Sequence, residues 1–328
     1  NNTIDKNIKN INALKTLSLF KKNAKTKSFL LFTWLKLYFV KNITKIKKLI
    51  NKKNSSFLLK IIYFLIFFLN FISCSKDSEI DKIGGVFSFC SKNRIQHFHP
   101  SLVSDESTSL VAHQIFEGLV KLNSTTLEVE PCLAESFYFN PKSYVYRFNL
   151  RDNIFFHDSK CFTKNKGRKL TTADVIYTFK NICTKQLINV GYHNTMKGVV
   201  KGAEDYFNGI TNEISGIRAT NKNTIEIELY RPNSLFLKRL SGINFSIIAK
   251  EAVEKYGINN NVGTGPFVPL KFDSYNDQQI LIKNKKYYKK DEDGVQLPYL
   301  DSICIDFEIG IKQQIKNVIN KKSSAVLN

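Results

Sequence analysis

The chain has 328 residues, of which 43% are hydrophobic, so it can bury a sizeable core and its length allows two or three domains. Its formal net charge of +21 suggests nucleic-acid binding, but residues 1–60 hold 15 lysines and one acid, a net +14, which leaves +7 for the other 268 residues. Basic residues ahead of an apolar run are typical of a secretion signal, so we do not expect the folded part to bind nucleic acid.

The N-terminal segment has the features of a leader and a signal peptide. We interpret residues 1–55 as a basic leader that need not belong to the native protein, because the chain begins with Asn1 and its only methionine is Met196. Residues 56–73 carry a mostly apolar run of the length of a signal h-region, which is too short for a comfortable membrane span.

A cysteine ends this apolar run. The tetrad Phe71-Ile72-Ser73-Cys74 resembles a bacterial lipobox, in which the cysteine receives a diacylglycerol and becomes the new N-terminus, although Phe71 stands where leucine is usual. We therefore predict that Cys74 is a lipid-attachment site, since two or more acyl chains hold a protein stably on a membrane. Residues 74–83 would then be a polar linker. The alternative is an ordinary signal peptide or anchor helix with a cysteine there by chance.

The other cysteines show no metal-binding pattern. Cysteines occur at positions 74, 90, 132, 161, 183 and 304, with no C-x-x-C and no Cys/His cluster at zinc spacing. We expect the five after Cys74 to be mostly buried, small apolar residues, and we expect no cofactor.

The first readable elements lie between residues 140 and 182. Residues 144–150 alternate as a half-buried strand after a turn at 140–143. Thr171 and Asp174 form a capping box, which predicts a helix beginning there. Its buried face would carry Val175, Phe179 and Ile182.

Later elements continue the mixture of strands and helices. Residues 224–229 alternate as a strand, residues 247–256 predict a helix that ends at Gly257, and strands are expected at 280–282 and 302–309. Because there is no regular βαβ order and no internal repeat, the fold class is α/β or mixed α+β.

Five motifs in a fixed order resemble one known family. They are GGVFSFCSKNRIQHFHPSLVSDESTSLVAHQIFEGLVKLN (84–123), CLAESFYFNPKSYVYRFNLRDNIFFHD (132–158), LTTADVIYTF (170–179), VGTGPFVPLKF (262–272) and QLPYLDSICIDF (296–307). Together they resemble family 5 extracellular solute-binding proteins, the peptide, dipeptide and nickel receptors of ABC importers. The resemblance covers residues 84–309.

The resemblance implies a periplasmic-binding-protein-like type II lobe that is truncated, since the chain after Cys74 is about half as long as a typical member. The expected parts are a first-lobe core (84–114 and 210–270), an inserted subdomain (115–209) and the start of an incomplete second lobe (271–328). The implied function is that of a membrane-anchored lipoprotein in the periplasm. It would capture oligopeptides by reversible binding and hinge closure and deliver them to an ABC permease and its ATPase.

The resemblance also implies ligand contacts. Ser104, Asp105 and Glu106 correspond to a segment that would contact a bound peptide, which would pair by strand addition. Phe245 and Phe267 would form apolar cleft walls. Gly265 lies in the loop 263–267, which is either a rigid turn or a segment near the cleft and hinge.

Three alternatives remain at this level. The chain lacks the G-x-S-x-G, GxGxxG and phosphate-loop motifs, so we do not expect an enzyme, and Glu135 with Asp152 or Asp158 more simply has packing or capping roles than those of a catalytic carboxylate pair. His97 and His99 could form a nickel pair in a receptor of the same family. A truncated or decayed lipoprotein without transport activity is the remaining alternative.

Overall fold

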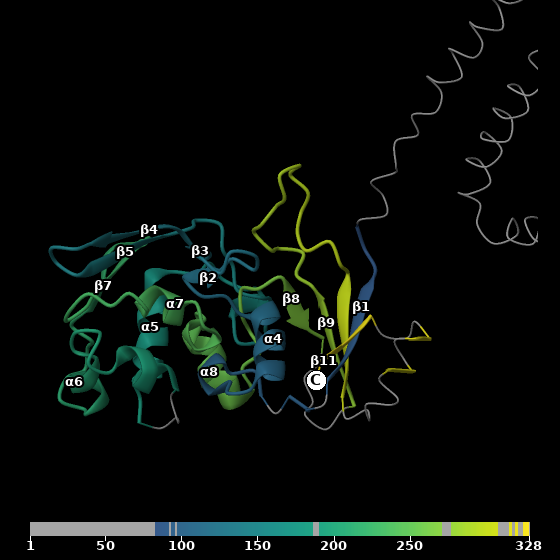
Figure 1. The fold of residues 1–328 in the computed structure, drawn as a ribbon, viewed down its shortest axis with the longest axis horizontal. Helices are drawn as coiled ribbons and strands as arrows, with labels where there is room; N and C mark the ends of the chain where they lie inside the picture. Colours follow the sequence, from purple (N-terminus) through teal and green to yellow (C-terminus); the bar gives the residue numbers. More distant parts are fainter. Residues whose placement is uncertain are drawn as a thin grey trace, which may run out of the picture. The chain divides into compact units, whose positions relative to one another are not determined.

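The computed structural model describes residues 83–328 apart from 92, 96, 186–189, 271–276, 308–314, 317–318, 321–323 and 328 (Figure 1). These residues belong to one compact unit, Glu79–Asn328. The predicted leader, signal peptide and Cys74 lie outside the described residues. Within the described part, no helix is both long and apolar enough to cross a bilayer.

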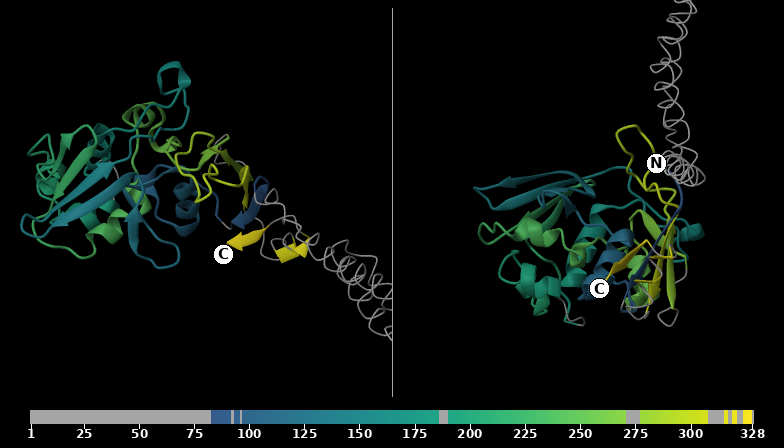
Figure 2. Two further views of the ribbon diagram at one scale, coloured as in Figure 1. Left: turned by 90° about the horizontal axis from the view of Figure 1, so that it is seen from above. Right: turned by 45° about the vertical axis from the view of Figure 1, so that its right-hand side comes forward.

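A mixed sheet joins the start of the described chain to its end. Its order is β11-β1-β10-β9-β8, where β1 pairs in parallel with β10 and β11, and β9 pairs antiparallel with β10 and β8. Its strands are β1 (Val86–Ser91), β8 (Phe267–Pro269), β9 (Gln278–Lys283), β10 (Ser302–Phe307) and β11 (Ala325–Leu327). Figure 2 shows β1 (blue) and the last strand (yellow) close together although they are far apart in the sequence.

The mixed sheet bears on the expected domain boundaries. Residues 278–307, which we expect to start a second lobe, share this one sheet with β1. The division of the chain into lobes stays a prediction.

A second sheet is wholly antiparallel. Its order is β4-β5-β7-β6, and a separate two-stranded ribbon pairs β2 with β3. These strands are β2 (Val120–Leu122), β3 (Val129–Pro131), β4 (Ala134–Asn140), β5 (Val145–Leu150), β6 (Ile217–Asn221) and β7 (Thr224–Glu228).

Helices and short turns complete the unit. The α-helices are α4 (Glu106–Ile115), α5 (Thr172–Ile182), α6 (Ala203–Phe207), α7 (Phe236–Leu240) and α8 (Lys250–Tyr256). The short helical turns are η2 (Pro100–Leu102), η3 (Thr163–Asn165), η4 (Tyr192–Met196), η5 (Ile243–Phe245) and η6 (Gly257–Asn259). Figure 1 shows α4 and α8 between the two sheets.

Each sheet has its own core. The larger core joins the inner face of the antiparallel sheet to α5, and Phe148 and Phe179 in it are fully buried. The smaller core joins the mixed sheet to α4, and it includes Ile305 and Ala112. The mixed α/β architecture confirms the predicted fold class.

The capping box of α5 is confirmed. Thr171 is the N-cap, its backbone N–H donates to the Asp174 carboxylate at 2.8 Å, and Val175, Phe179 and Ile182 are all fully buried. The hydrogen bonds replace those that the first helical turn lacks, which explains why the helix begins at this residue.

Other predicted boundaries differ by a few residues. The helix predicted at 247–256 begins at Lys250, because the N–H groups of Ile247 and Ile248 donate to the Glu117 backbone carbonyl and the Thr178 hydroxyl and not within a helix of their own. It ends before Gly257 as predicted, where φ is +58°. The strand predicted from residue 144 begins at Val145, since Tyr144 takes a positive φ in the preceding turn.

The prediction that the five cysteines after Cys74 are mostly buried is confirmed. Cys90, Cys132 and Cys183 are buried, and Cys161 and Cys304 are partly buried. Residue 74 lies outside the described part.

Candidate functional site

The predicted peptide-contact segment 104–106 lies at the start of α4. Asp105 is the N-cap of this helix, and its carboxylate accepts a hydrogen bond from the Thr108 N–H at 2.8 Å. Ser104 and Glu106 are exposed. Asp105 therefore has a capping role, and the exposed side chains on either side of it are free to meet a ligand.

Gly265 lies at the other end of α4, in the loop 263–267. Its N–H donates to the Ile115 carbonyl at 2.9 Å, and a Cβ on Gly263 would lie 2.0 Å from that same oxygen. This loop needs its glycines for close approach to the helix end. Since α4 has 10 residues, Gly265 and the segment 104–106 are separated by the helix length of about 15 Å, so the structure does not bring them together.

A buried histidine holds the same loop from the opposite side. The His157 Nε2 donates to the Gly265 carbonyl at 2.9 Å, and the Gly263 N–H donates to Nδ1 at 3.3 Å. Burial lowers the pKa of His157 to about 4, so the ring is neutral at physiological pH with its proton on Nε2. Both ring nitrogens therefore hold the loop backbone by hydrogen bonds.

Glu117 is the central group of a buried polar cluster. This carboxylate is 7% exposed and accepts hydrogen bonds from three separate segments of the chain. Its partners are Tyr287 (2.7 Å), Tyr288 (3.3 Å), Lys289 (3.2 Å), Thr264 (3.3 Å) and the Cys132 thiol (3.5 Å). Because Thr264 lies in the loop 263–267, Glu117 ties that loop to the beginning of β4 and to the segment after β9.

The hydroxyl and thiol groups around Glu117 stay protonated. Burial, together with the nearby Glu117 charge, raises the pKa of Cys132 to about 11 and also raises the pKa of Tyr287 and Tyr288. These groups therefore donate hydrogen bonds and do not act as nucleophiles. Lys289 supplies the positive charge that a buried carboxylate requires.

The two predicted cleft phenylalanines are core residues of different clusters. Phe245 is 3% exposed and packs against Phe179, with ring centroids 5.9 Å apart. Phe267 is 4% exposed and belongs to the core of the mixed sheet. Burial gives both rings a packing role, and contact with a ligand stays a prediction.

The histidine pair lies just before η2. His99 is 2% exposed. Burial, and to a smaller extent the nearby His97, lowers its pKa to about 4. Among the described residues, no group of three or more His, Cys, Asp or Glu side chains could hold a metal ion. The nickel alternative stays a prediction.

The three carboxylates considered as catalytic groups are separated into different interactions. Glu135 is exposed on β4. Asp152 pairs with Lys169 at 3.0 Å. Although burial opposes it, hydrogen bonds from Lys286 and the Gly167 N–H lower the pKa of Asp158 to about 2. An acid that is ionised throughout the physiological range cannot serve as the general acid of a carboxylate pair.

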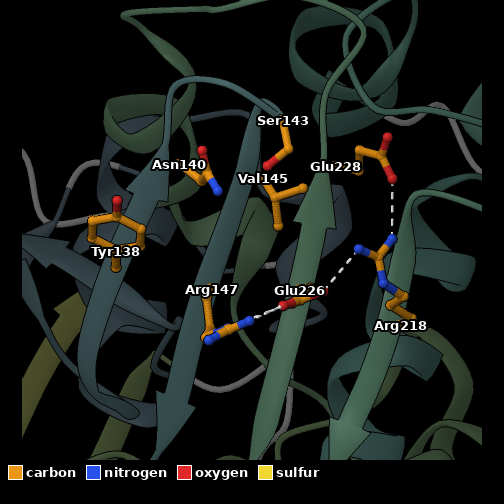
Figure 3. Close-up of a pocket in the computed structure, with 8 residues that line it drawn as sticks. All are labelled: Tyr138, Asn140, Ser143, Val145, Arg147, Arg218, Glu226 and Glu228. Carbon is orange, nitrogen blue, oxygen red and sulfur yellow. Dashed lines mark hydrogen bonds and ion pairs between the residues drawn. The ribbon is translucent and has the colours of Figure 1, made fainter.

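A polar hollow lies on the outer face of the antiparallel sheet (Figure 3). It has a volume of about 320 Å³, and across it Arg147 donates to Glu226 at 2.7 Å and Arg218 pairs with Glu226 at 2.8 Å and Glu228 at 3.0 Å. The hydrogen bond from Arg147 lowers the pKa of Glu226, which partial burial opposes. The charges here satisfy one another, as on a solvated sheet face.

The sequence reasoning missed Glu117 and His157. The sequence contains an indication of each residue. Glu117 is a single charge within the apolar run 115–120, and His157 follows two phenylalanines. A charged or imidazole group that is buried within such a run requires hydrogen-bond partners.

These elements define a mixed α/β protein in which the loop 263–267, just before β8, is held by hydrogen bonds to Ile115, His157 and Glu117. The family model described as bacterial extracellular solute-binding proteins, family 5 Middle, matches residues 128–317, which is more than half of the chain. The chain belongs to this family. It is a family of solute-binding proteins and not of enzymes.

Curated relatives and solved structures support this family assignment. The chain is 30% identical to heme-binding protein A of Haemophilus influenzae over 217 residues, covering 62% of this chain and 37% of that protein. It is 30% identical to the dipeptide-binding protein of Escherichia coli over 190 residues, covering 55% and 34%. A periplasmic oligopeptide-binding protein of Borrelia burgdorferi superposes with a TM-score of 0.64 at 28% identity, covering 74% and 46%.

A further structure supports the fold alone. The peptide-bound periplasmic binding protein of Helicobacter pylori gives a TM-score of 0.62 at 24% identity, covering 75% of this chain and 47% of that one. The chain thus spans about a third of the length of the curated relatives and about half of the solved ones.

Proposed function

We propose that this chain is part of the substrate-binding component of an ABC importer, which captures oligopeptides outside the inner membrane and presents them to the permease. The observation that carries the proposal is the family match over residues 128–317, with relatives named for dipeptide and oligopeptide binding. Binding is reversible and no bond is made or broken.

The geometry gives the proposal a physical basis. A receptor that closes around its ligand needs rigid parts on which the contact residues are held. Here the loop 263–267 is fixed by Ile115, His157 and Glu117, so it behaves as a rigid joint and not as a mobile lid. Ser104 and Glu106, exposed beside the capped end of α4, are the proposed peptide contacts.

Peptide binding is tested directly by isothermal titration calorimetry of the full chain with a mixture of tripeptides. Saturable heat with the tripeptides, and none with the matching free amino acids, supports the proposal. Absence of binding by a chain that is folded by circular dichroism, or cleavage of the peptides, contradicts it.

We also propose that the intact protein is held at the cell envelope by a lipid on Cys74. The support is the lipobox-like tetrad 71–74 after an apolar run. Labelled palmitate fed to expressing cells should mark the parent chain and not the Cys74→Ser variant. A Cys74→Ser variant that still takes up label ends this proposal.

A further inference from the structure

The net charge of residues 83–328 is concentrated in two stretches of the chain. These residues include 32 basic and 24 acidic side chains, a net +8. Residues 175–203 and 229–250 each contribute four basic side chains and no acid, so together they account for the whole excess, and the rest of this part of the chain is neutral. A general excess of lysine in the composition would be spread along the chain, whereas this excess is confined to two places.

The fold brings these two stretches together. The Tyr230 N–H donates to the Val199 carbonyl at 2.9 Å, and the Arg239 guanidinium donates to the Asn194 carbonyl. Helix α7 therefore packs beside η4 and the turn that follows it. Figure 1 shows α7 in the half of the unit that contains the antiparallel sheet, whereas β1 and β11, which lie near the two ends of the described chain, belong to the other half.

Four basic side chains are exposed where the two stretches meet. They are Lys197, Arg231, Lys238 and Arg239. Among the residues that the structure describes, none of the four pairs with a carboxylate, whereas Lys180 in the first stretch pairs with Glu213 at 2.6 Å. Four positive charges without a partner of opposite sign create a local positive potential, which attracts an anionic surface.

Two exposed apolar side chains lie among these charges. Tyr230 and Leu235 are each 50% exposed. Leu235 is three and four residues before Lys238 and Arg239, which is the spacing of side chains on one helix face. Tyr230 directly precedes Arg231 in the chain. We call the four basic residues together with Tyr230 and Leu235 the basic patch.

We propose that the basic patch contacts the surface of a bilayer that contains anionic phospholipid. Each lysine or arginine near such a surface strengthens binding about fivefold. A leucine gains free energy by entering the boundary between headgroups and acyl chains, and tyrosine is enriched at the same depth. A soluble polyanion would satisfy the charges but would leave Leu235 in water, so the combination of cations with exposed apolar side chains favours a lipid surface.

This inference goes beyond peptide capture, and it stands apart from the lipid proposed on Cys74. A single acyl chain holds a protein on a membrane only marginally, and a basic patch is one of the additions that makes the attachment stable. The patch would thus be a second contact with the same membrane. Its test uses the chain without an attached lipid and without peptide, so either of those proposals can fail while this one holds.

Hydrogen–deuterium exchange with vesicles tests the proposal at the patch itself. The full chain is mixed with vesicles of phosphatidylglycerol and phosphatidylcholine in equal parts, or of phosphatidylcholine alone, and the exchange of the amides of 235–241 is followed by mass spectrometry. The amides of 291–295, between β9 and β10, are the internal reference. A local measurement is needed because the lysines of residues 1–60 also attract anionic vesicles.

Two double variants of equal net charge provide the matched comparison. Lys197→Glu/Lys238→Glu reverses two charges of the basic patch. Lys222→Glu/Lys285→Glu reverses two lysines outside it. All four lysines are exposed, so both variants should keep the fold, which circular dichroism checks. A third variant, Leu235→Ser, removes the apolar side chain and keeps the charges.

Anionic vesicles should slow the exchange of 235–241 in the parent and in Lys222→Glu/Lys285→Glu, with no change at 291–295. Lys197→Glu/Lys238→Glu should lose this protection, because reversal of two charges lowers the association constant of the patch by at least about 25-fold. Leu235→Ser should lose the part of the protection that survives high salt, since salt screens only the electrostatic contribution.

Three results would overturn the proposal. The first is unchanged exchange of 235–241 in the folded parent, or equal slowing in the two double variants. The second is equal slowing by phosphatidylcholine vesicles, because anionic lipid would then not be recognised. The third is protection by soluble polyglutamate that equals that of the vesicles and does not depend on Leu235, because the partner would then be an acidic macromolecule.

Discussion

The two sheets differ in how their faces meet their surroundings. The antiparallel sheet buries its inner face in the larger core and carries a row of paired charges on the outer one, where Arg147, Glu226 and Arg218 lie across neighbouring strands. The mixed sheet has a smaller core and an apolar groove beside α4. The outer face of the antiparallel sheet therefore has charges that satisfy one another, whereas the groove on the mixed sheet is lined mainly by apolar side chains.

The junction between the regions should be the most sensitive point. Glu117→Ala leaves Lys289 and the surrounding donors without their buried acceptor, and breaking a buried ion pair costs about 3–5 kcal/mol of the free energy of unfolding. Urea unfolding followed by circular dichroism measures the loss. Glu117→Gln keeps an acceptor oxygen and should cost less, about 1–3 kcal/mol. Equal stability of Glu117→Ala and the parent would show that the cluster does not join the two regions.

Disturbing the close approach of the loop 263–267 to α4 should have the next largest effect on stability. Gly263→Ala puts a Cβ 2.0 Å from the Ile115 carbonyl oxygen, which forces backbone movement and should cost about 3 kcal/mol. Thermal unfolding of both variants compares this loss with that of Gly242→Ala, where the added Cβ would lie 3.2 Å from the nearest atom. We expect a clearly smaller loss for Gly242→Ala, and the reverse order would contradict the rigid joint.

Acid should destabilise the protein through its buried imidazoles. The pKa of His157 in the folded protein is lowered to about 4 from an ordinary 6.5, so the unfolded chain binds a proton first as the pH falls. The stability from this group is present above pH 6.5 and is lost between pH 6.5 and 4, by about 2 kcal/mol at pH 5. Urea unfolding at pH 7.5 and 5 measures this, and His157→Gln should flatten the dependence by that amount. If the free energy of unfolding of His157→Gln falls between pH 7.5 and 5 as much as that of the parent, this ring does not titrate as proposed.

The charged row on the antiparallel sheet should show the smallest effect. Glu226→Ala removes the shared partner of Arg147 and Arg218, and because both arginines are partly exposed the cost should be about 1–2 kcal/mol. Glu130→Ala, which removes an exposed pair with Lys121, is the control and should cost about 0–1 kcal/mol. A loss of 4 kcal/mol or more at Glu226 would mean that this face is not simply solvated.

Local patterns predicted the local structure well. The capping box at Thr171 and the alternation at 224–229 gave α5 and β7, because hydrogen-bond satisfaction and side-chain burial act within a few residues. The order of motifs also gave the family and the fold class. The pairing of β1 with β10 was not predicted, since the partners Val86 and Ser302 are far apart in the chain and a period of two does not name a partner.

The candidate site was only partly predictable. Gly265 was expected either in a rigid turn or near the cleft and hinge, and in the structure its N–H donates to the Ile115 carbonyl at 2.9 Å. Phe245 and Phe267 are buried in the two cores, as aromatic rings in an apolar context commonly are, and their predicted contact with a ligand stays a prediction. The donors to Glu117 come from three distant segments, so their convergence depends on the tertiary fold.

The most direct test of the central claim is the recovery of bound peptide. The full chain is incubated with a tripeptide mixture, separated from free peptide by gel filtration, denatured and analysed by mass spectrometry. A solute-binding protein of this family should release intact tripeptides in a saturable amount per chain. Peptide fragments in place of intact tripeptides, or no peptide retained above that with an unrelated protein, would contradict the account.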